Sequence, residues 1–193
     1  MARVALRRLR LDQVWLLVSP GNPLKPAAGM APMAERLRSA TRLADGRRIV
    51  ATGIEARLRT RYTYDTLRAL RRLFPLVRFV WLMGADNLVQ LPRWQHWLGI
   101  VGLMPFAVMP RPTYNGRALA GKAASRLRPA LRPAREAPVL AGRKPPAWTF
   151  LPARQNPLSA TALRRAAPQA TSDPVPPGSR AARKQPLLEG APS

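Results

Sequence analysis

Four short apolar runs, separated by segments with helical spacing, constrain the fold of this sequence more than any other feature. Val14–Val18 is a continuous run of large apolar residues, which is typical of a strand buried on both faces of a parallel sheet. Similar runs follow at 48–52, 77–83 and 102–109. Because a helical pattern separates each run from the next, the sequence predicts an α/β fold, with a doubly wound parallel sheet and helices on both faces.

The segments between these runs predict the helices. Met33, Leu37 and Ala40 recur at helical spacing, and Gly46 supplies a stop signal shortly after them. Leu67 and Leu70 form the apolar face of another helix, which ends before Pro75. Helices are thus expected at 2–10, 33–44 and 63–73.

The C-terminal part of the sequence has weaker patterns. Prolines interrupt any regular structure between 115 and 146, and Trp148–Leu151 predicts a last short strand. A helix is expected over 159–167, with Ser159 as its N-cap. We therefore expect one domain over 1–167, followed at 168–193 by a disordered tail that is rich in Pro, Ala and Ser.

The net charge of the chain is +24, and most of it comes from arginine. Such a charge favours anionic partners, such as nucleotides, nucleic acid or acidic lipid. An alternative explanation is a biased coding composition, which raises the Arg, Ala and Pro contents together and places arginine on solvent-facing surfaces. Charge therefore narrows the class of partner without fixing the fold.

The scarcity of cysteine and histidine excludes several kinds of site. The sequence has no cysteine, which excludes disulfides, thiolate metal sites and cysteine nucleophiles. Its single histidine, His96, argues against a histidine-built metal site or a histidine-based triad. No apolar stretch reaches the roughly 18–20 residues of a membrane span, and the N-terminus lacks the apolar core of a secretory signal. We therefore expect a cytoplasmic protein without a membrane partner.

Polar residues follow the predicted strands, where ligands bind in parallel sheets. Asn22 and Lys25 lie in the loop after the first strand, and offer an amide and a mobile positive charge. Asp86 follows Gly84 at the end of the third strand, where a carboxylate can accept hydrogen bonds from ribose hydroxyls. Each also has a simpler structural explanation, as part of an ordinary loop or as a helix cap.

Helix starts and tryptophans offer further groups that suit a nucleotide. Thr63 opens the helix at 63–73, where unpaired N–H groups form either an anion site or a simple cap. Trp94 and Trp97 provide stacking surfaces for an aromatic ring, unless both belong to the core. Near the C-terminus, two hydroxyls, a predicted helix start and a basic side chain combine in a way that suits phosphate: Ser159, Thr161 and Arg164.

The order and spacing of these motifs resemble those of bacterial nicotinate-nucleotide adenylyltransferases, over residues 3–166. The motifs that carry the resemblance are Pro-x-Asn-Pro-x-Lys at 20–25, Tyr-Thr-x-Asp-Thr-Leu at 62–67, Gly-Ala-Asp at 84–86, Leu-Pro-x-Trp at 91–94 and Leu-Ser-x-Thr-x-Leu-Arg at 158–164. The resemblance implies a Rossmann-like nucleotidyltransferase fold. It implies adenylyl transfer from ATP to nicotinate mononucleotide, which gives deamido-NAD and pyrophosphate in NAD biosynthesis, with Mg²⁺ bound to the ATP.

The resemblance also implies roles for individual residues, in three groups. By this match the phosphates would lie near Asn22 and Lys25, and the nicotinate pocket would include Thr63 and Thr66. Asp86 would face a nucleotide ribose, and Trp94 would stack on the pyridine ring. The ATP phosphates would contact Ser159, Thr161 and Arg164.

The sequence departs from the family at its N-terminus. The family begins with a strand that leads into Gly-Gly-x-Phe-[Asp/Asn]-Pro-x-His-x-Gly-His, and this motif is absent here. The resemblance implies that those histidines bind the ATP phosphates and that the first strand, normally central in the sheet, is missing. No catalytic residue is therefore assigned, and His96 lies in a different motif.

Two explanations of this departure are open: a misplaced start, with the motif upstream, or a true fragment. We expect a misplaced start, because the other motifs are intact and the helix at 2–10 lacks an N-cap residue. The coding sequence upstream of Met1 tests this expectation.

Two other functions also fit the sequence. A catalytically dead nucleotide-binding remnant would bind ATP without turnover. A basic RNA-binding protein would explain the charge, but the aromatic content is only 6% and no base-stacking aromatics are interleaved with the arginine clusters. We therefore expect no nucleic acid partner. The oligomeric state, and the choice between nicotinate and nicotinamide mononucleotide, stay open.

Overall fold

The computed structural model describes residues 1–21 and 30–153, and all of these lie in one compact unit, Met1–Pro157. The strands in order are β1 (Val14–Leu17), β2 (Ile49–Thr52), β3 (Trp81–Gly84), β4 (Phe106–Met109) and β5 (Trp148–Phe150). The α-helices are α1 (Ala2–Arg8), α2 (Met33–Leu43), α3 (Ile54–Leu58), α4 (Thr63–Leu73), α5 (Ala85–Gln90), α6 (Trp97–Leu103), α7 (Asn115–Leu119) and α8 (Lys122–Arg126). Short 3₁₀-helices are η1 (Leu91–Arg93), η2 (Arg128–Ala130) and η3 (Ala134–Gly142).

All the strand pairs are parallel, as the sequence predicted. In one sheet β1 pairs with β2, and in the other β4 lies between β3 and β5. Successive side chains point to opposite faces of each strand. In β4, for example, Phe106 and Val108 pack into one core cluster, whereas Ala107 and Met109 pack into another.

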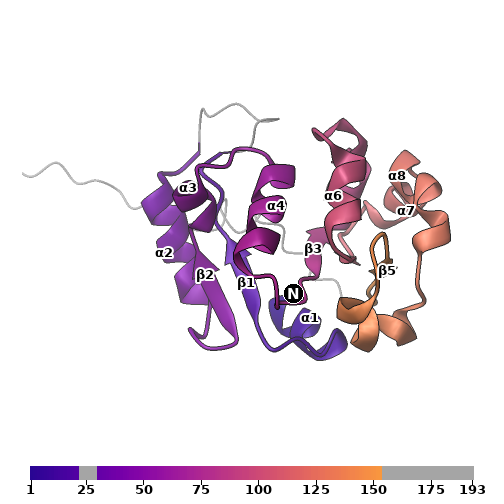
Figure 1. Ribbon diagram of the computed structural model, residues 1–193, viewed down its shortest axis with the longest axis horizontal. Helices are drawn as coiled ribbons and strands as arrows, with labels where there is room; N and C mark the ends of the chain where they lie inside the picture. The colour runs from indigo at the N-terminus through magenta and orange to yellow at the C-terminus, as the bar shows by residue number, and fades with distance from the viewer. Residues whose placement is uncertain (22–29, 154–193) are drawn as a thin grey trace, which may run out of the picture. The chain divides into compact units, whose positions relative to one another are not determined.

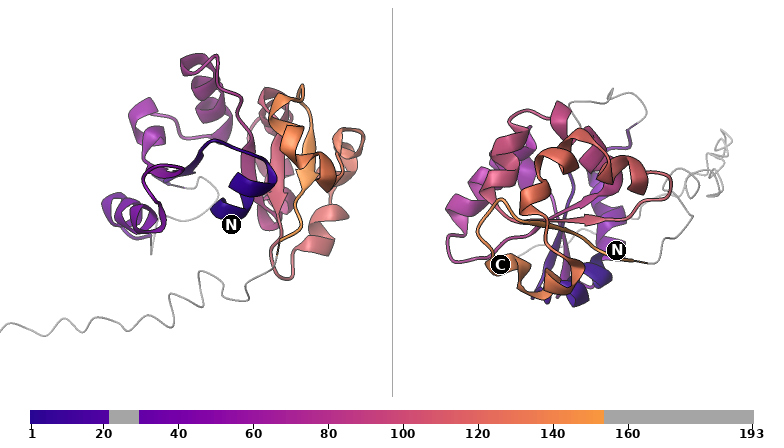
Figure 2. Two further views of the ribbon diagram at one scale, coloured as in Figure 1. Left: turned by 90° about the horizontal axis from the view of Figure 1, so that it is seen from below. Right: turned by 90° about the vertical axis from the view of Figure 1, so that its right-hand side faces the viewer.

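Helices cover both faces of the strands, which confirms the predicted α/β architecture (Figures 1 and 2). On one face, Leu6 and Leu9 of the α1 segment pack with residues of both sheets. On the other face, α4 and α6 contribute Leu67, Leu70 and Ile100 to a separate cluster. Helices α1 and α4 therefore lie on opposite sides of the strands.

The core around β4 and β5 depends on two large aromatic side chains. The rings of Phe106 and Trp148 are stacked, with their centroids 5.5 Å apart. The Trp148 indole N–H donates a hydrogen bond of 2.8 Å to the Leu127 carbonyl oxygen, so its polar group is satisfied although the side chain is buried. This contact fixes the segment after α8 against the sheet.

The sheet is interrupted between β1 and β3, which share no ladder among the described residues. Side chains bridge this position instead, since the Trp15 ring packs edge-on against Phe74 and Phe79, at centroid distances of 5.4 and 5.9 Å. Within the described ranges, each of these two strands has a ladder partner on one side only, and such edges can associate with other strands.

Two of the predicted strands are shorter than expected. The run at 77–83 forms a strand only from Trp81, and Val77 is 51% exposed. In the run at 102–109, the first two residues instead end α6, because Ile100 and Val101 bury a helical face. Pro105 then separates this helix from β4, in agreement with the conformational limits that proline places on itself and on the preceding residue.

The other sequence predictions have mixed outcomes. The helices at 2–10, 33–44 and 63–73 are confirmed as α1, α2 and α4, and the last short strand is confirmed as β5. The region at 115–146 is more regular than expected: α7 and α8 both end before Pro129, whereas the 3₁₀-helices η2 and η3 contain Pro129 and Pro138. The helix at 159–167, the domain end at 167 and the tail at 168–193 lie outside the described residues. No helix in the described part of the chain is long and apolar enough to cross a membrane.

The turn between α2 and β2 is built around one carboxylate. Asp45 Oδ1 accepts hydrogen bonds from the backbone N–H groups of Arg47, Arg48 and Ile49, at 3.0, 2.8 and 2.8 Å. The bond from Ile49 contributes most to holding the pKa of Asp45 below its ordinary value. Gly46, with φ of +71°, allows the left-handed backbone that this turn requires.

Asp45→Ala is expected to lower the melting temperature at pH 7, because the backbone donors of the turn lose their acceptor. A carboxyl with a depressed pKa stabilises the fold above its unfolded pKa of about 3.9, and this contribution is lost as the pH falls through the lower folded pKa. The difference between wild type and variant should therefore shrink below about pH 4. Thermal unfolding from pH 7 to pH 2 measures this.

Asp12→Ala is the matched control, since the Asp12 carboxylate accepts no hydrogen bond within the described residues. A destabilisation by Asp45→Ala that is equal at all pH values, or equal to that of Asp12→Ala, would contradict this account of the turn.

Candidate active site

The carboxyl ends of β3 and β4 bring a carboxylate and a guanidinium together. In the parallel register, Gly84 of β3 lies opposite Met109 of β4. Asp86 follows Gly84 in the first turn of α5, and Arg111 follows Met109 in the next loop. The Arg111 Nε lies 3.5 Å from Asp86 Oδ1, and the two side chains are 44% and 33% exposed. The result is a half-exposed ion pair at the edge of the sheet where ligands bind in this class of fold.

Glycine is required at position 84 for space. Its φ of −80° is accessible to any residue, but a Cβ atom there would overlap Asp86 Oδ1 and would lie 3.1 Å from Arg111 Nε. The side chains of the ion pair therefore occupy the volume that a larger residue would need. Any substitution of Gly84 would displace one of them.

The loop after β4 holds Arg111 through its own backbone. The Arg111 N–H donates a 2.8 Å hydrogen bond to Asn115 Oδ1, and its carbonyl oxygen accepts one of 3.2 Å from the Tyr114 N–H. Thr113 adopts a left-handed backbone with φ of +67°, which closes the turn. Arg111 was not among the residues predicted from the sequence, although its position after the fourth strand was a sufficient signal.

The two threonines that the sequence assigned to a nicotinate pocket differ in environment. Thr63, the first residue of α4, is half-buried, and the preceding Tyr62 makes no capping hydrogen bond with its side chain. Thr66 is only 1% exposed, and its hydroxyl lies 2.8 Å from the Thr60 hydroxyl and donates to the Tyr62 carbonyl oxygen at 3.3 Å. In this structure Thr66 therefore ties the start of α4 to the loop before it.

Trp94 is half-buried at the end of η1. Its ring packs against Trp81 of β3 with a centroid distance of 5.8 Å and an interplanar angle of 53°. Its indole N–H is buried and has no hydrogen-bond partner among the described residues. Trp97 lines a neighbouring cavity of about 280 Å³ together with Tyr64 and His96, whose rings lie 5.1 Å apart. Both tryptophans thus have one side in the core and lie beside aromatic groups.

The loop after β1 is held at both ends by Arg36 of α2. Its guanidinium donates to the carbonyl oxygens of Ser19 and Pro20 at 2.6 and 3.1 Å, and to that of Ala31 at 2.9 Å. Arg36 was not among the residues predicted from the sequence. The predicted phosphate ligands of this loop, Asn22 and Lys25, lie outside the described residues.

The predicted phosphate group near the C-terminus, Ser159, Thr161 and Arg164, also lies outside the described residues. Within the described part of the chain, no group of three or more His, Cys, Asp or Glu side chains could hold a metal ion. Among the described residues, Asp86 meets Arg111 at the ends of β3 and β4. Thr63 and Thr66 lie elsewhere, in the first turns of α4.

The chain matches the cytidylyltransferase-like family model over residues 1–166. It is 63% identical over 164 residues to a probable nicotinate-nucleotide adenylyltransferase of Gluconobacter oxydans, which covers 85% of this chain and 84% of the relative. A protein of the same description from Gluconacetobacter diazotrophicus is 62% identical over 167 residues, which covers 86% of this chain and 78% of the relative. A third, from Parvibaculum lavamentivorans, is 51% identical over 85% of this chain and 82% of its own length.

A solved structure supports the fold. Nicotinic acid mononucleotide adenylyltransferase of Plasmodium falciparum, complexed with APC, superposes with a TM-score of 0.51 at 14% identity, over 83% of this chain and 69% of its own. At this low identity the likeness extends to the fold alone. Together with the sequence relatives, it identifies the chain as a Rossmann-like member of the nicotinate-nucleotide adenylyltransferase family.

Proposed function

We propose that this protein transfers the adenylyl group of ATP to nicotinate mononucleotide, which gives deamido-NAD and pyrophosphate. The observation that carries the proposal is the 63% identity to a probable nicotinate-nucleotide adenylyltransferase across most of both chains. The ion pair of Asp86 and Arg111 supports it, because it lies where ligands bind in a parallel sheet.

In the proposed reaction, the phosphate of the mononucleotide attacks the α-phosphorus of ATP, and pyrophosphate leaves. The reaction brings together two anions, so the protein must mainly position them and neutralise their charge. Arg111 is suited to this task, since a guanidinium can donate two parallel hydrogen bonds to a phosphate. Its Nε faces Asp86 at 3.5 Å, which leaves the terminal nitrogens for a ligand.

The remaining roles follow from side-chain chemistry. The Asp86 carboxylate would accept a hydrogen bond from a nucleotide ribose, and Trp94 would stack on the pyridine ring. Thr63 would help bind the nicotinate group at the start of α4, whereas Thr66, being buried, would act by positioning that start. We assign phosphate contacts to Asn22, Lys25, Ser159, Thr161 and Arg164.

Mg²⁺ is proposed to arrive with ATP. Magnesium usually keeps several waters and binds through substrate phosphates and one or two carboxylates. The described residues fit this mode, since Asp86 offers a carboxylate at the strand ends and no cluster of three ligands surrounds it. Bound Mg²⁺ would neutralise phosphate charge.

The purified protein is expected to release pyrophosphate when it receives ATP and nicotinate mononucleotide together, and not with either alone. A coupled pyrophosphate assay measures this, with nicotinamide mononucleotide as a parallel substrate. ATP binding is measured beside turnover by calorimetry. ATP binding without pyrophosphate release from any mononucleotide would contradict the proposal in favour of a dead remnant, and salt-sensitive RNA binding without ATP binding would favour an RNA-binding protein.

Trp94→Ala is expected to raise the KM for the mononucleotide about tenfold, in line with the value of about 1–3 kcal/mol for stacking of a base on an aromatic side chain. The KM for ATP should stay close to that of the wild type. A change in kcat alone, or an equal rise of both KM values, would show that Trp94 acts only through the core.

Gly84→Ala is expected to lower kcat/KM by about 10- to 100-fold, because the new methyl group displaces Asp86 or Arg111 from the strand ends. Gly102→Ala is the matched control: it lies in α6, where a Cβ would meet nothing within 4 Å. The control should keep its activity, and its stability should rise slightly because alanine favours the helix. Equal kcat/KM values for the two variants would show that the Asp86–Arg111 pair does not belong to the active site.

A further inference from the structure

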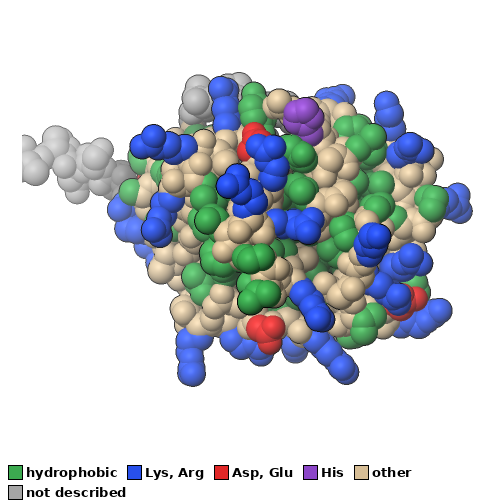
Figure 3. All heavy atoms as spheres, in the orientation of Figure 1, with side chains coloured by type: hydrophobic (Ala, Val, Ile, Leu, Met, Phe, Trp, Pro, Cys, Tyr) green, Lys and Arg blue, Asp and Glu red, His purple; other side chains and the backbone are tan. Residues whose placement is uncertain are grey.

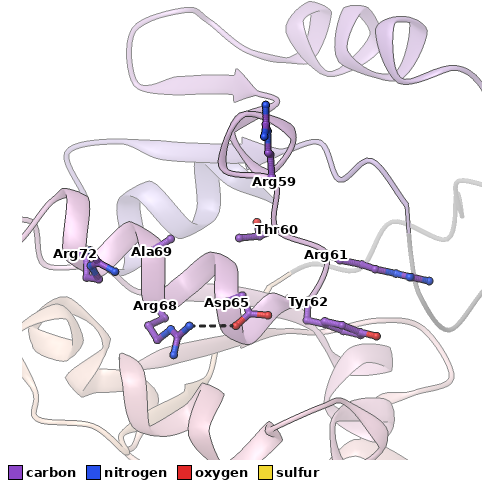
Figure 4. Close-up of a pocket in the computed structure, with 8 residues that line it drawn as sticks. All are labelled: Arg59, Thr60, Arg61, Tyr62, Asp65, Arg68, Ala69 and Arg72. Atoms are coloured by element: carbon purple, nitrogen blue, oxygen red, sulfur yellow. Dashed lines mark ion pairs between the residues drawn. The ribbon is translucent and has the colours of Figure 1, made fainter.

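A second concave surface lies on the outward side of α4 and along the segment that precedes this helix. We call it the basic pocket: a cavity of about 420 Å³ lined by Arg59, Thr60, Arg61, Tyr62, Asp65, Arg68, Ala69 and Arg72. Its volume is within the usual range for small-ligand sites, about 300–1,000 Å³. Figure 4 shows that one side of it comes from α4 and the other from the segment that joins α3 to α4.

The basic pocket differs from the strand-end site of Asp86 and Arg111, although it adjoins the start of α4, where Thr60 contacts the buried Thr66 hydroxyl. On α4 it uses residues 65, 68, 69 and 72, which recur at helical spacing and form one stripe. The core-facing residues of the same helix, Thr66, Leu67 and Leu70, are buried on the other side. Neither Asp86 nor Arg111 lines the pocket.

The charge of the pocket is strongly positive. Four of the lining residues are arginines, of which Arg59 and Arg61 extend their side chains away from α4 (Figure 4), and the only carboxylate among the lining residues is that of Asp65. Asp65 is already engaged, since its Oδ1 lies 3.7 Å from Arg68 Nη2. An anion would therefore meet an excess of positive charge, at a surface where Lys and Arg side chains are far more abundant than acidic ones (Figure 3).

The backbone of Arg59 supplies a second observation. Arg59 caps the end of α3 in the left-handed conformation, with φ of +52° and ψ of +34°. Glycine or asparagine is the usual residue at this position, because a Cβ atom makes the conformation unfavourable. Arg10 has the same kind of backbone after α1, but of these two arginines only Arg59 lies at the rim of a cavity that three other arginines line.

We propose that the basic pocket binds an oligophosphate anion, that is, a chain of two or more linked phosphates, carried by a nucleotide or free in solution. Guanidinium groups suit this chemistry because each can donate paired hydrogen bonds to phosphate oxygens. Arg59 and Arg61 extend away from α4 in Figure 4, so binding requires that their side chains turn toward Arg68 and Arg72. The proposal does not depend on the adenylyl-transfer function.

Arg59→Gly tests the proposal, because it removes the guanidinium and relieves the left-handed backbone at the same time. We expect the affinity for sodium tripolyphosphate to fall about tenfold, which corresponds to the loss of one charge-assisted hydrogen bond. The melting temperature should stay the same or rise, since glycine favours this backbone. Calorimetry and thermal unfolding, on the full chain, measure the two effects.

Arg10→Gly is the matched control. Arg10 also has a left-handed backbone, with φ of +51°, and it does not line the pocket. The control removes the same charge and the same backbone strain, so it should leave tripolyphosphate affinity unchanged. An equal loss of affinity in the two variants would show that the anion responds only to net charge, and would overturn the proposal.

A titration followed by ¹H–¹⁵N NMR locates the anion. Tripolyphosphate should shift the amide signals of residues 59–62 and of α4 more than those elsewhere, and ADP should compete for the same signals if the phosphate chain is what binds. Shifts confined to residues 84–86 and 111 would assign the anion to the candidate active site and contradict the proposal. Adenylyl transfer by Arg59→Gly is expected to be unchanged. A failure of the anion-binding proposal can therefore be distinguished from a failure of the proposed function.

Discussion

The parallel register between β3 and β4 is the constraint on which the candidate active site depends. It places Gly84 opposite Met109, so that the two chain segments that leave these strands begin side by side. Asp86 and Arg111 are 25 residues apart in the sequence, so only the pairing of β3 with β4 brings them together. A slip of one residue would turn every side chain of either strand to the other face and would separate the pair.

The interior of the fold supports this register through shape. Phe106 and Val108 of β4 are enclosed by the cluster that contains Trp148, while Ala107 and Met109 face α1 and η3. Because the two faces of β4 carry side chains of different shape, only one orientation of the strand fills both clusters. The division between β1 and β3 is bridged by Trp15, Phe74 and Phe79, whose rings pack edge to face.

The sequence predicted the parallel α/β class, the helix at 63–73 and the place of Asp86, because local periodicity and strand ends carry that information. It overestimated the strand at 102–109, since apolar residues of a short buried helix and of a strand look alike. Arg111 could have been found from its position after the fourth strand, but its pairing with Asp86 depends on strand register, which the local pattern does not carry. The burial of Thr66 was not predictable either, since it depends on the loop that brings Thr60 to its hydroxyl.

Arginine has two different roles on this molecule. Arg36 and Arg111 are held by defined contacts, to three carbonyl oxygens in one case and to Asp86 in the other. The arginines of the basic pocket lie at a concave surface, where Arg68 is paired with Asp65 and the other three make no ion pair among the described residues. Net charge alone, which the sequence gives, does not separate these roles.

A double-mutant cycle on Asp86 and Arg111, with ATP affinity as the readout, tests the central claim most directly. If the pair acts as one unit at the nucleotide site, the losses from Asp86→Asn and Arg111→Gln should be non-additive, with a coupling of at least about 0.5 kcal/mol. Strictly additive losses, or no loss of ATP affinity in either single variant, would contradict the claim that the ends of β3 and β4 form the nucleotide site.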